Sequence, residues 1–150
     1  MLDKLAELYD IGGPLVSVEC ALFEGNPNCV TAVLLRFDSV STVFRAVADD
    51  DTLTITLGPL VPAMGERLLN VGSYPPWSRC IGLGVAWAWQ LTNQQGYSDG
   101  VRLEFSEPGE EFRAVIELIV VASAIQIFAV LPAAMDQQWL AANTAITSPL

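Results

Sequence analysis

The alternation of apolar and polar residues in several short segments constrains the fold most strongly. Between residues 52 and 57, leucine and isoleucine alternate strictly with threonine. Successive side chains of a β-strand point to opposite faces of a sheet, so a period of two predicts a half-buried strand. The same period recurs in segments 14–24, 30–38, 85–93 and 101–106. These patterns indicate a chain built mainly from β-strands.

Two faces follow from this alternation. In segment 14–24 one face is expected to carry Val16, Val18, Cys20 and Leu22. In segment 85–93 one face is expected to carry Val85, Trp87, Trp89, Leu91 and Asn93. A less regular strand is expected at 43–48, with turns at 25–28 and 49–51.

The apolar run 114–131 could be mistaken for a membrane span. It contains the carboxylate of Glu117, which costs about 2.5–3.5 kcal/mol at the centre of a bilayer. Eight of its residues are β-branched, which favours strands. We therefore expect two buried strands, at 112–121 and 124–130, and no membrane association.

Short helices are expected at both ends of the chain, at residues 2–9 and 135–143. Segment 58–78 holds four prolines and three glycines. It predicts a long connection with one helical turn around 64–69, of a kind that is often functional or covers a sheet edge.

The expected fold class is mostly β, with α+β as the alternative if helices pack on one sheet face. Strands that follow one another in hairpins form an antiparallel meander, which can make a curled sheet, a barrel or a sandwich. The length of 150 residues suits one domain spanning 1–150.

Composition narrows the expected partners. The net charge is −10, which opposes binding to nucleic acid and favours a basic protein partner. Apolar residues make up 52% of the chain, so a homo-oligomer is also expected. The first ten residues do not resemble a secretion signal, which makes the cytoplasm the expected location.

Few residues point to catalysis. The chain has no histidine, and its three cysteines lack metal-binding spacing, so no metal or cofactor is expected. Three features have both a chemical and a structural interpretation, the structural one being favoured: the acidic turn Asp49–Asp51, Cys80 beside Arg79, and the Gly82–Gly84 pair. Glu117 is expected either to face outward on its strand or to pair with Arg102 or Arg113. Carboxylates such as Asp99, Glu104 and Glu117 leave an enzyme as a minor alternative.

The segment from Cys80 to Ser98 contains no charged residue and is the most informative part of the chain. It carries Trp87 and Trp89 at a spacing that places both on one strand face. Aromatic and amide side chains together can form a recognition surface. The alternative is structural, with the tryptophans filling the core and the amides closing a hairpin. The candidate binding residues are Trp87, Trp89, Asn93, Gln94, Gln95, Tyr97 and Asp99.

The string from Trp89 to Gly100 has the pattern W-x3-NQQGY-x-DG. It resembles a signature of small uncharacterised bacterial proteins that form a domain-of-unknown-function family. Small acidic proteins of this kind are similar to immunity proteins encoded beside toxins. The resemblance implies no established activity.

Three function classes follow. The first is a non-catalytic protein-interaction protein, for example an immunity-type inhibitor of a basic toxin. The second is a small-ligand-binding β protein with a pocket lined by Trp87, Trp89 and Tyr97. The third is an enzyme that uses carboxylates.

Overall fold

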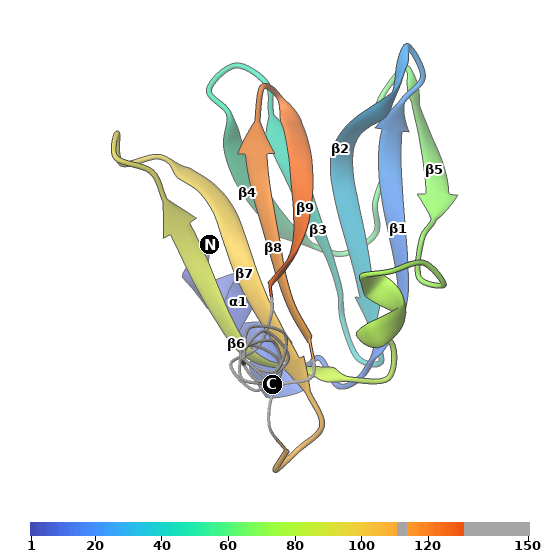
Figure 1. The fold of residues 1–150 in the computed structure, drawn as a ribbon, viewed down its shortest axis with the longest axis vertical. Helices are drawn as coiled ribbons and strands as arrows, with labels where there is room; N and C mark the ends of the chain where they lie inside the picture. The colour runs from blue at the N-terminus through green and yellow to red at the C-terminus, as the bar shows by residue number, and fades with distance from the viewer. Residues whose placement is uncertain (111–113, 131–150) are drawn as a thin grey trace, which may run out of the picture.

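The structure is a computed structural model that describes residues 1–110 and 114–130. Within these residues, one helix is followed by nine strands, with a short 3-10 turn, η1, between the fifth and the sixth (Figure 1). In chain order the elements are α1 (Leu2–Ile11), β1 (Leu15–Phe23), β2 (Asn26–Phe37), β3 (Ser41–Val47), β4 (Thr52–Leu57), β5 (Glu66–Asn70), η1 (Trp77–Arg79), β6 (Gly84–Thr92), β7 (Ser98–Ser106), β8 (Ala114–Val121) and β9 (Ala124–Val130).

The mostly β fold predicted from the alternation is confirmed, as is the helix at the start of the chain. The helix expected at 135–143 and the first two residues of the strand expected at 112–121 lie outside the described residues. The turn expected at 25–28 is tighter than predicted, because β2 already begins at Asn26.

The strands form two antiparallel sheets (Figure 1). The first has the order β4-β3-β2-β1-β5 and the second the order β6-β7-β8-β9. Inner side chains of both sheets belong to one apolar core. Within the described residues the strands close no barrel, so of the predicted arrangements the structure shows packed sheets.

Large side chains that exclude water fill this core. Phe44 and Leu35 come from the first sheet, Phe105 and Leu103 from the second, and Trp77 from η1; each is at most 2% exposed. Burying a side chain of this size stabilises a fold by about 1.5–3 kcal/mol. The core therefore holds the two sheets and the η1 turn together.

Helix α1 packs beside two edge strands, β4 and β6. Its Leu5 and Leu8 are buried in the core, while the Lys4 Nζ donates a 2.9 Å hydrogen bond to the Ile55 carbonyl of β4. Among the described residues no helix is both long enough and apolar enough to cross a bilayer.

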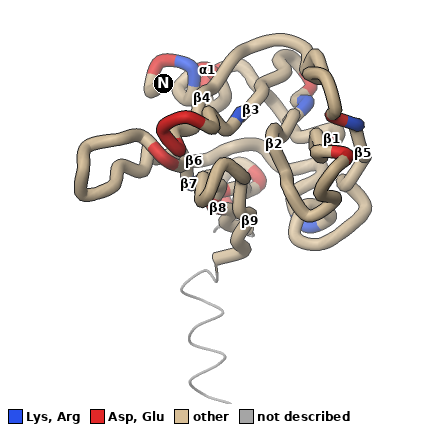
Figure 2. The backbone as a smooth tube through the Cα atoms, turned by 90° about the horizontal axis from the view of Figure 1, so that it is seen from above, with Lys and Arg blue, Asp and Glu red and all other residues tan. Residues whose placement is uncertain are grey.

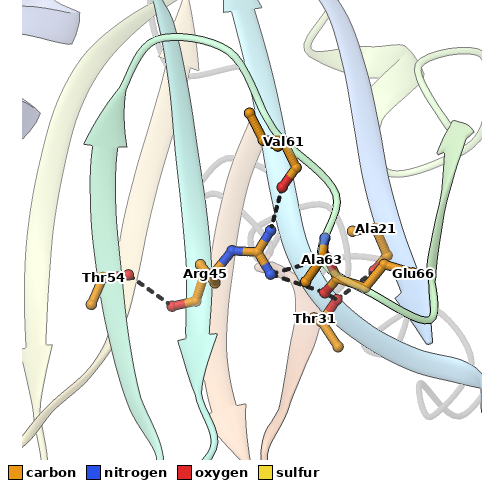
Figure 3. A network of polar contacts seen from close by, with 7 residues as sticks. All are labelled: Ala21, Thr31, Arg45, Thr54, Val61, Ala63 and Glu66. Carbon is orange, nitrogen blue, oxygen red and sulfur yellow. Dashed lines mark hydrogen bonds and ion pairs between the residues drawn. The ribbon is translucent and has the colours of Figure 1, made fainter.

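The chain between β4 and β5 runs across the outer face of the first sheet, from one edge to the other (Figures 1 and 3). The helical turn predicted around residues 64–69 is wrong, because this segment contains β5, which pairs antiparallel with β1. The expectation that this long connection covers a sheet edge agrees better with the structure, since β5 covers the open edge of β1. Leu60 of the crossing segment is buried against Leu34 and Val43.

A polar network fixes the same crossing segment (Figure 3). The Arg45 guanidinium lies 2.9 Å from a carboxylate oxygen of Glu66 and donates to the Val61 carbonyl at 3.2 Å. The Ala63 amide and the Thr31 hydroxyl also donate to the Glu66 carboxylate. Burial alone would raise the pKa of Glu66, but these donors and the charge of Arg45 lower it overall.

Two hairpin turns tie the sheets together at one end. The backbone amide of Ser123, in the β8–β9 turn, donates a 2.7 Å hydrogen bond to the Asp51 carboxylate of the β3–β4 turn. The Ser123 hydroxyl donates to the Ala48 carbonyl at 3.2 Å. The acidic turn at 49–51 is therefore structural, and Asp51 is more than a solvated side chain.

Two β-bulges change the faces that alternation predicts. The pairing of β1 with β2 slips at Val16, so Leu15 enters the core while Val16 is exposed. The pairing of β6 with β7 slips after Val85, which is buried, whereas Trp87 is exposed. The prediction that Val85 shares a face with Trp87 is wrong, because a bulge inserts one unpaired residue and reverses the alternation.

Candidate functional site

Two tryptophans stand on the outer face of the second sheet. Trp87 is 60% exposed and Trp89 41% exposed, and their rings are stacked with centroids 6.3 Å apart. Between them, Ala88 packs against the core. The prediction that both tryptophans share one strand face is confirmed, and the alternative that they fill the core is wrong.

The register of the sheet determines which residues surround them. Trp89 is opposite Arg102 on β7, Arg102 is opposite Glu117 on β8, and Glu117 is opposite Phe128 on β9. One residue row further along, Trp87 is opposite Glu104. We call Trp87, Trp89, Arg102, Glu104, Glu117 and Phe128 the aromatic face.

Arg102 lies at the centre of the aromatic face. Its guanidinium carbon is 6.0 Å from the centroid of Trp89, at the outer limit of a cation–π contact. Its Nε donates a 3.0 Å hydrogen bond to Glu117 in a partly exposed ion pair. The predicted pairing of Glu117 with Arg102 is confirmed, so Glu117 is held by a neighbour on the same face.

Glu104 differs from Glu117. It is only 8% exposed, and its Oε2 has no hydrogen-bond partner among the described residues. Its cross-strand neighbours are Trp87 and Val115. Burial raises the pKa of Glu104 above its ordinary value, although the charge of Arg102 acts in the opposite direction. Such an unpaired buried carboxylate is rare in a folded protein and calls for an explanation.

The remaining candidate residues form the β6–β7 hairpin, which extends beyond the rest of the second sheet (Figure 1). The Asn93 carboxamide accepts hydrogen bonds from the amides of Gln95 and Tyr97, at 2.9 and 3.2 Å. Asn93 therefore shapes the turn, while Gln94, Gln95 and Tyr97 are exposed at its tip. Asp99 lies on β7, where the register with β6 shifts.

Trp87 also borders two grooves beside α1. One has a volume of about 760 Å³ and is lined by residues that include Tyr9, Pro14 and Ser106. The other has a volume of about 290 Å³ and lies against the side of α1 that carries Leu2 and Tyr9. Trp89 and Tyr97 line neither groove, so the three residues predicted to line one pocket are not brought together in these two.

The structure also tests the cysteine, paired-carboxylate and metal interpretations of the sequence. Cys80 is fully buried, and burial raises the pKa of its thiol to about 12, which leaves it an unreactive thiol at neutral pH. Glu104 and Glu117 lie diagonally across β7 and β8 rather than opposite each other. Within residues 1–110 and 114–130, no group of three or more histidine, cysteine or acidic residues could hold a metal ion.

The sequence did not single out Arg102 or Phe128 as partners of the tryptophans. Arg102 alternates with apolar residues in β7, which shows that it faces outward, but only the register brings it beside Trp89. Phe128 is 47% exposed two strands away. The pairing of strands joins these residues, and a single sequence does not determine that pairing.

One comparison with known proteins identifies a relationship. A family model described as "Family of unknown function (DUF6334)" matches residues 5–134. No curated protein and no solved structure matches the chain. The matched segment includes α1 from Leu5 onward and the nine strands of the described residues. The chain therefore belongs to DUF6334, a family of unknown function, as its resemblance to a domain of unknown function predicted.

Proposed function

We propose that the protein binds another protein through the aromatic face, and that the partner's contact surface is basic. The exposed, stacked pair of Trp87 and Trp89 carries the proposal. Tryptophan and arginine are the residues most enriched among those that dominate the binding energy of protein interfaces. Here both types lie together on one strand pair, with Arg102 beside Trp89.

The surroundings of the tryptophans also favour an interface. Val121 and Phe128, on the same side of the sheet, are about half exposed. A polar group, the Arg102–Glu117 ion pair, lies among these apolar side chains. An apolar surface with a few placed polar groups is typical of the centre of a protein interface.

Charge favours a basic partner over a second copy. Each copy carries a net charge of −10. Acidic segments are spread over the fold and few basic ones lie among them (Figure 2). A face-to-face dimer would also bring together two Glu104 carboxylates, whose Oε2 atoms have no hydrogen-bond partner among the described residues. Like charges oppose such an approach, whereas a basic surface would be attracted to it. An inhibitor of a basic toxin domain would fit this description.

The test begins with a tagged full-length chain, used to isolate a partner from the native lysate at low salt. The purified complex is then measured with the double variant Trp87→Ala/Trp89→Ala and with Tyr74→Ala as a control. Tyr74 is an exposed aromatic residue, 62% accessible, in the loop that follows β5. We expect the double variant to weaken the complex by about a hundredfold and the control to leave it unchanged.

Two further measurements, the salt dependence of the complex and light scattering of the isolated protein, complete the test. Raising the ionic strength from about 0.01 M to about 1 M shortens the screening length from about 30 Å to about 3 Å, so the complex should weaken steeply. A complex that tolerates this change, or one that ignores loss of both tryptophans, contradicts the proposal. Light scattering that reports a dimer, converted to a monomer by the double variant, would assign the aromatic face to a second copy instead.

A further inference from the structure

We infer that Glu104 and Trp87 form a receptor for one arginine side chain of the partner. The inference rests on the proposed function, because it assigns the chemistry that the aromatic face recognises. Glu104 is more than nine-tenths buried, and its Oε2 has no partner among the described residues. The register places it on the same face as the exposed Trp87.

The charges of the aromatic face do not balance. Its described residues include two carboxylates, Glu104 and Glu117, and one guanidinium, Arg102. That guanidinium is hydrogen-bonded to Glu117 at 3.0 Å. The described residues of the face therefore carry one more carboxylate than guanidinium, and the hydrogen bond of Arg102 goes to Glu117 rather than to Glu104. A basic partner that covers the face is the natural source of a positive charge for Glu104.

The face already contains an example of the expected contact. Arg102 approaches the ring of Trp89 and is paired with the carboxylate of Glu117. One row along the sheet, the indole of Trp87 and the carboxylate of Glu104 are directly opposite each other, and Oε2 of Glu104 has no hydrogen-bond partner among the described residues. Arginine suits this place better than lysine, since its planar guanidinium can stack on an indole while donating to a carboxylate.

Access to Glu104 depends on Trp87. The indole belongs to β6, an edge strand of the sheet, and 60% of its surface is exposed. Its ring is stacked on that of Trp89, so the indole must move for a guanidinium to reach the carboxylate. In that arrangement the indole becomes one wall of the arginine site.

The experiment titrates the full-length protein with N-acetyl-arginine amide and follows the indole N–H signal of Trp87 by NMR. N-acetyl-citrulline amide has the same shape without the charge, and N-acetyl-lysine amide carries the charge without the planar group. We expect saturable binding of the arginine amide, weaker binding of the lysine amide, and none of the citrulline amide.

Variants then assign the site. Glu104→Gln should weaken binding of the arginine amide by about tenfold or more, because a charge-assisted hydrogen bond is lost. Glu19→Gln removes the same charge from the other sheet and should change the affinity less than twofold. Retained thermal stability of both variants shows that neither effect comes from unfolding.

Three results would overturn the inference: equal binding of the citrulline amide, unchanged affinity of Glu104→Gln, or tighter binding after Arg113→Gln. The last would mean that Arg113, outside the described residues, already supplies the charge. None of these results touches the proposed function, which depends on how the isolated partner responds to loss of Trp87 and Trp89. Preference for the lysine amide would replace arginine by lysine as the recognised group.

Discussion

Replacing Glu104 with glutamine should stabilise the isolated protein. The side chain is 8% exposed and its Oε2 has no hydrogen-bond partner among the described residues. Moving a carboxylate out of water without a partner costs free energy, and the raised pKa of Glu104 shows that burial outweighs the attraction of Arg102. Glutamine keeps the shape of the side chain and removes the charge.

The expected gain follows from the cost of such a group. A buried polar group without a partner costs about 1–3 kcal/mol, and the amide retains part of that cost. We therefore expect the free energy of unfolding of Glu104→Gln to rise by about 1 kcal/mol at neutral pH. For a chain of 150 residues this corresponds to a rise in Tm of about 2–4 °C.

The gain should depend on pH in one direction. The pKa of Glu104 is higher in the folded state than its ordinary value of 4.5. Below that value the carboxyl is protonated in both states, and its burial costs little. As the pH rises through the folded pKa, the wild-type protein loses this stability while the glutamine variant does not. The advantage of the variant is therefore small at acidic pH and complete at neutral pH.

Urea unfolding of both proteins at several pH values measures this difference. Glu117→Gln is the matched control, because it lies on the same face but removes one partner of the Arg102 ion pair. That pair is partly exposed, so the control should lose up to about 1 kcal/mol. If Glu104→Gln were destabilising to the same extent, Glu104 would have a partner, and the argument for an unbalanced face would be refuted.

Three further substitutions test the fold. Asp51→Ala should lose about 1 kcal/mol in urea unfolding, because the hydrogen bond from Ser123 disappears, whereas Asp51→Asn should lose less. Glu66→Gln should destabilise the protein at neutral pH; since the pKa of Glu66 is lowered, its stabilising effect is lost as the pH falls, and the difference should vanish in acid. Leu60→Ala should cost about 2–3 kcal/mol while the exposed neighbour Val61→Ala costs little; equal losses in thermal unfolding would contradict the packing of the crossing segment.

Most strands were predictable because their residues alternate, and residues 52–57 are an example in which prediction and structure agree. β5 was missed for a physical reason. It is short, lies at the edge of its sheet and is exposed along most of its length, so it lacks the alternation that burial imposes. The order of the strands depends on contacts far apart in sequence, and the division into two sheets was therefore not predictable.

The candidate site was predictable only in part. The spacing of Trp87 and Trp89 correctly placed them on one face. Whether that face points to the core or to solvent depends on a bulge after Val85, which no local sequence pattern shows. Asn93 was singled out as a binding residue, and its side chain closes the hairpin turn. Glu104 was considered as a carboxylate, but its burial without a partner required the neighbouring strands.

The contrast between two glutamates supports a functional explanation for the unbalanced charge. Glu66 accepts hydrogen bonds from Arg45, Thr31 and the Ala63 amide. A carboxylate with a structural role in this protein is therefore surrounded by donors. Glu104 is buried to a similar degree, and its Oε2 has no such donor among the described residues. An apolar residue at this place, beside Val115, would stabilise the isolated fold. Local features that oppose stability are expected at functional sites. If the Glu104 carboxylate binds a cation from another molecule, both observations are explained: the missing hydrogen-bond partner among the described residues and the exposed tryptophan beside it.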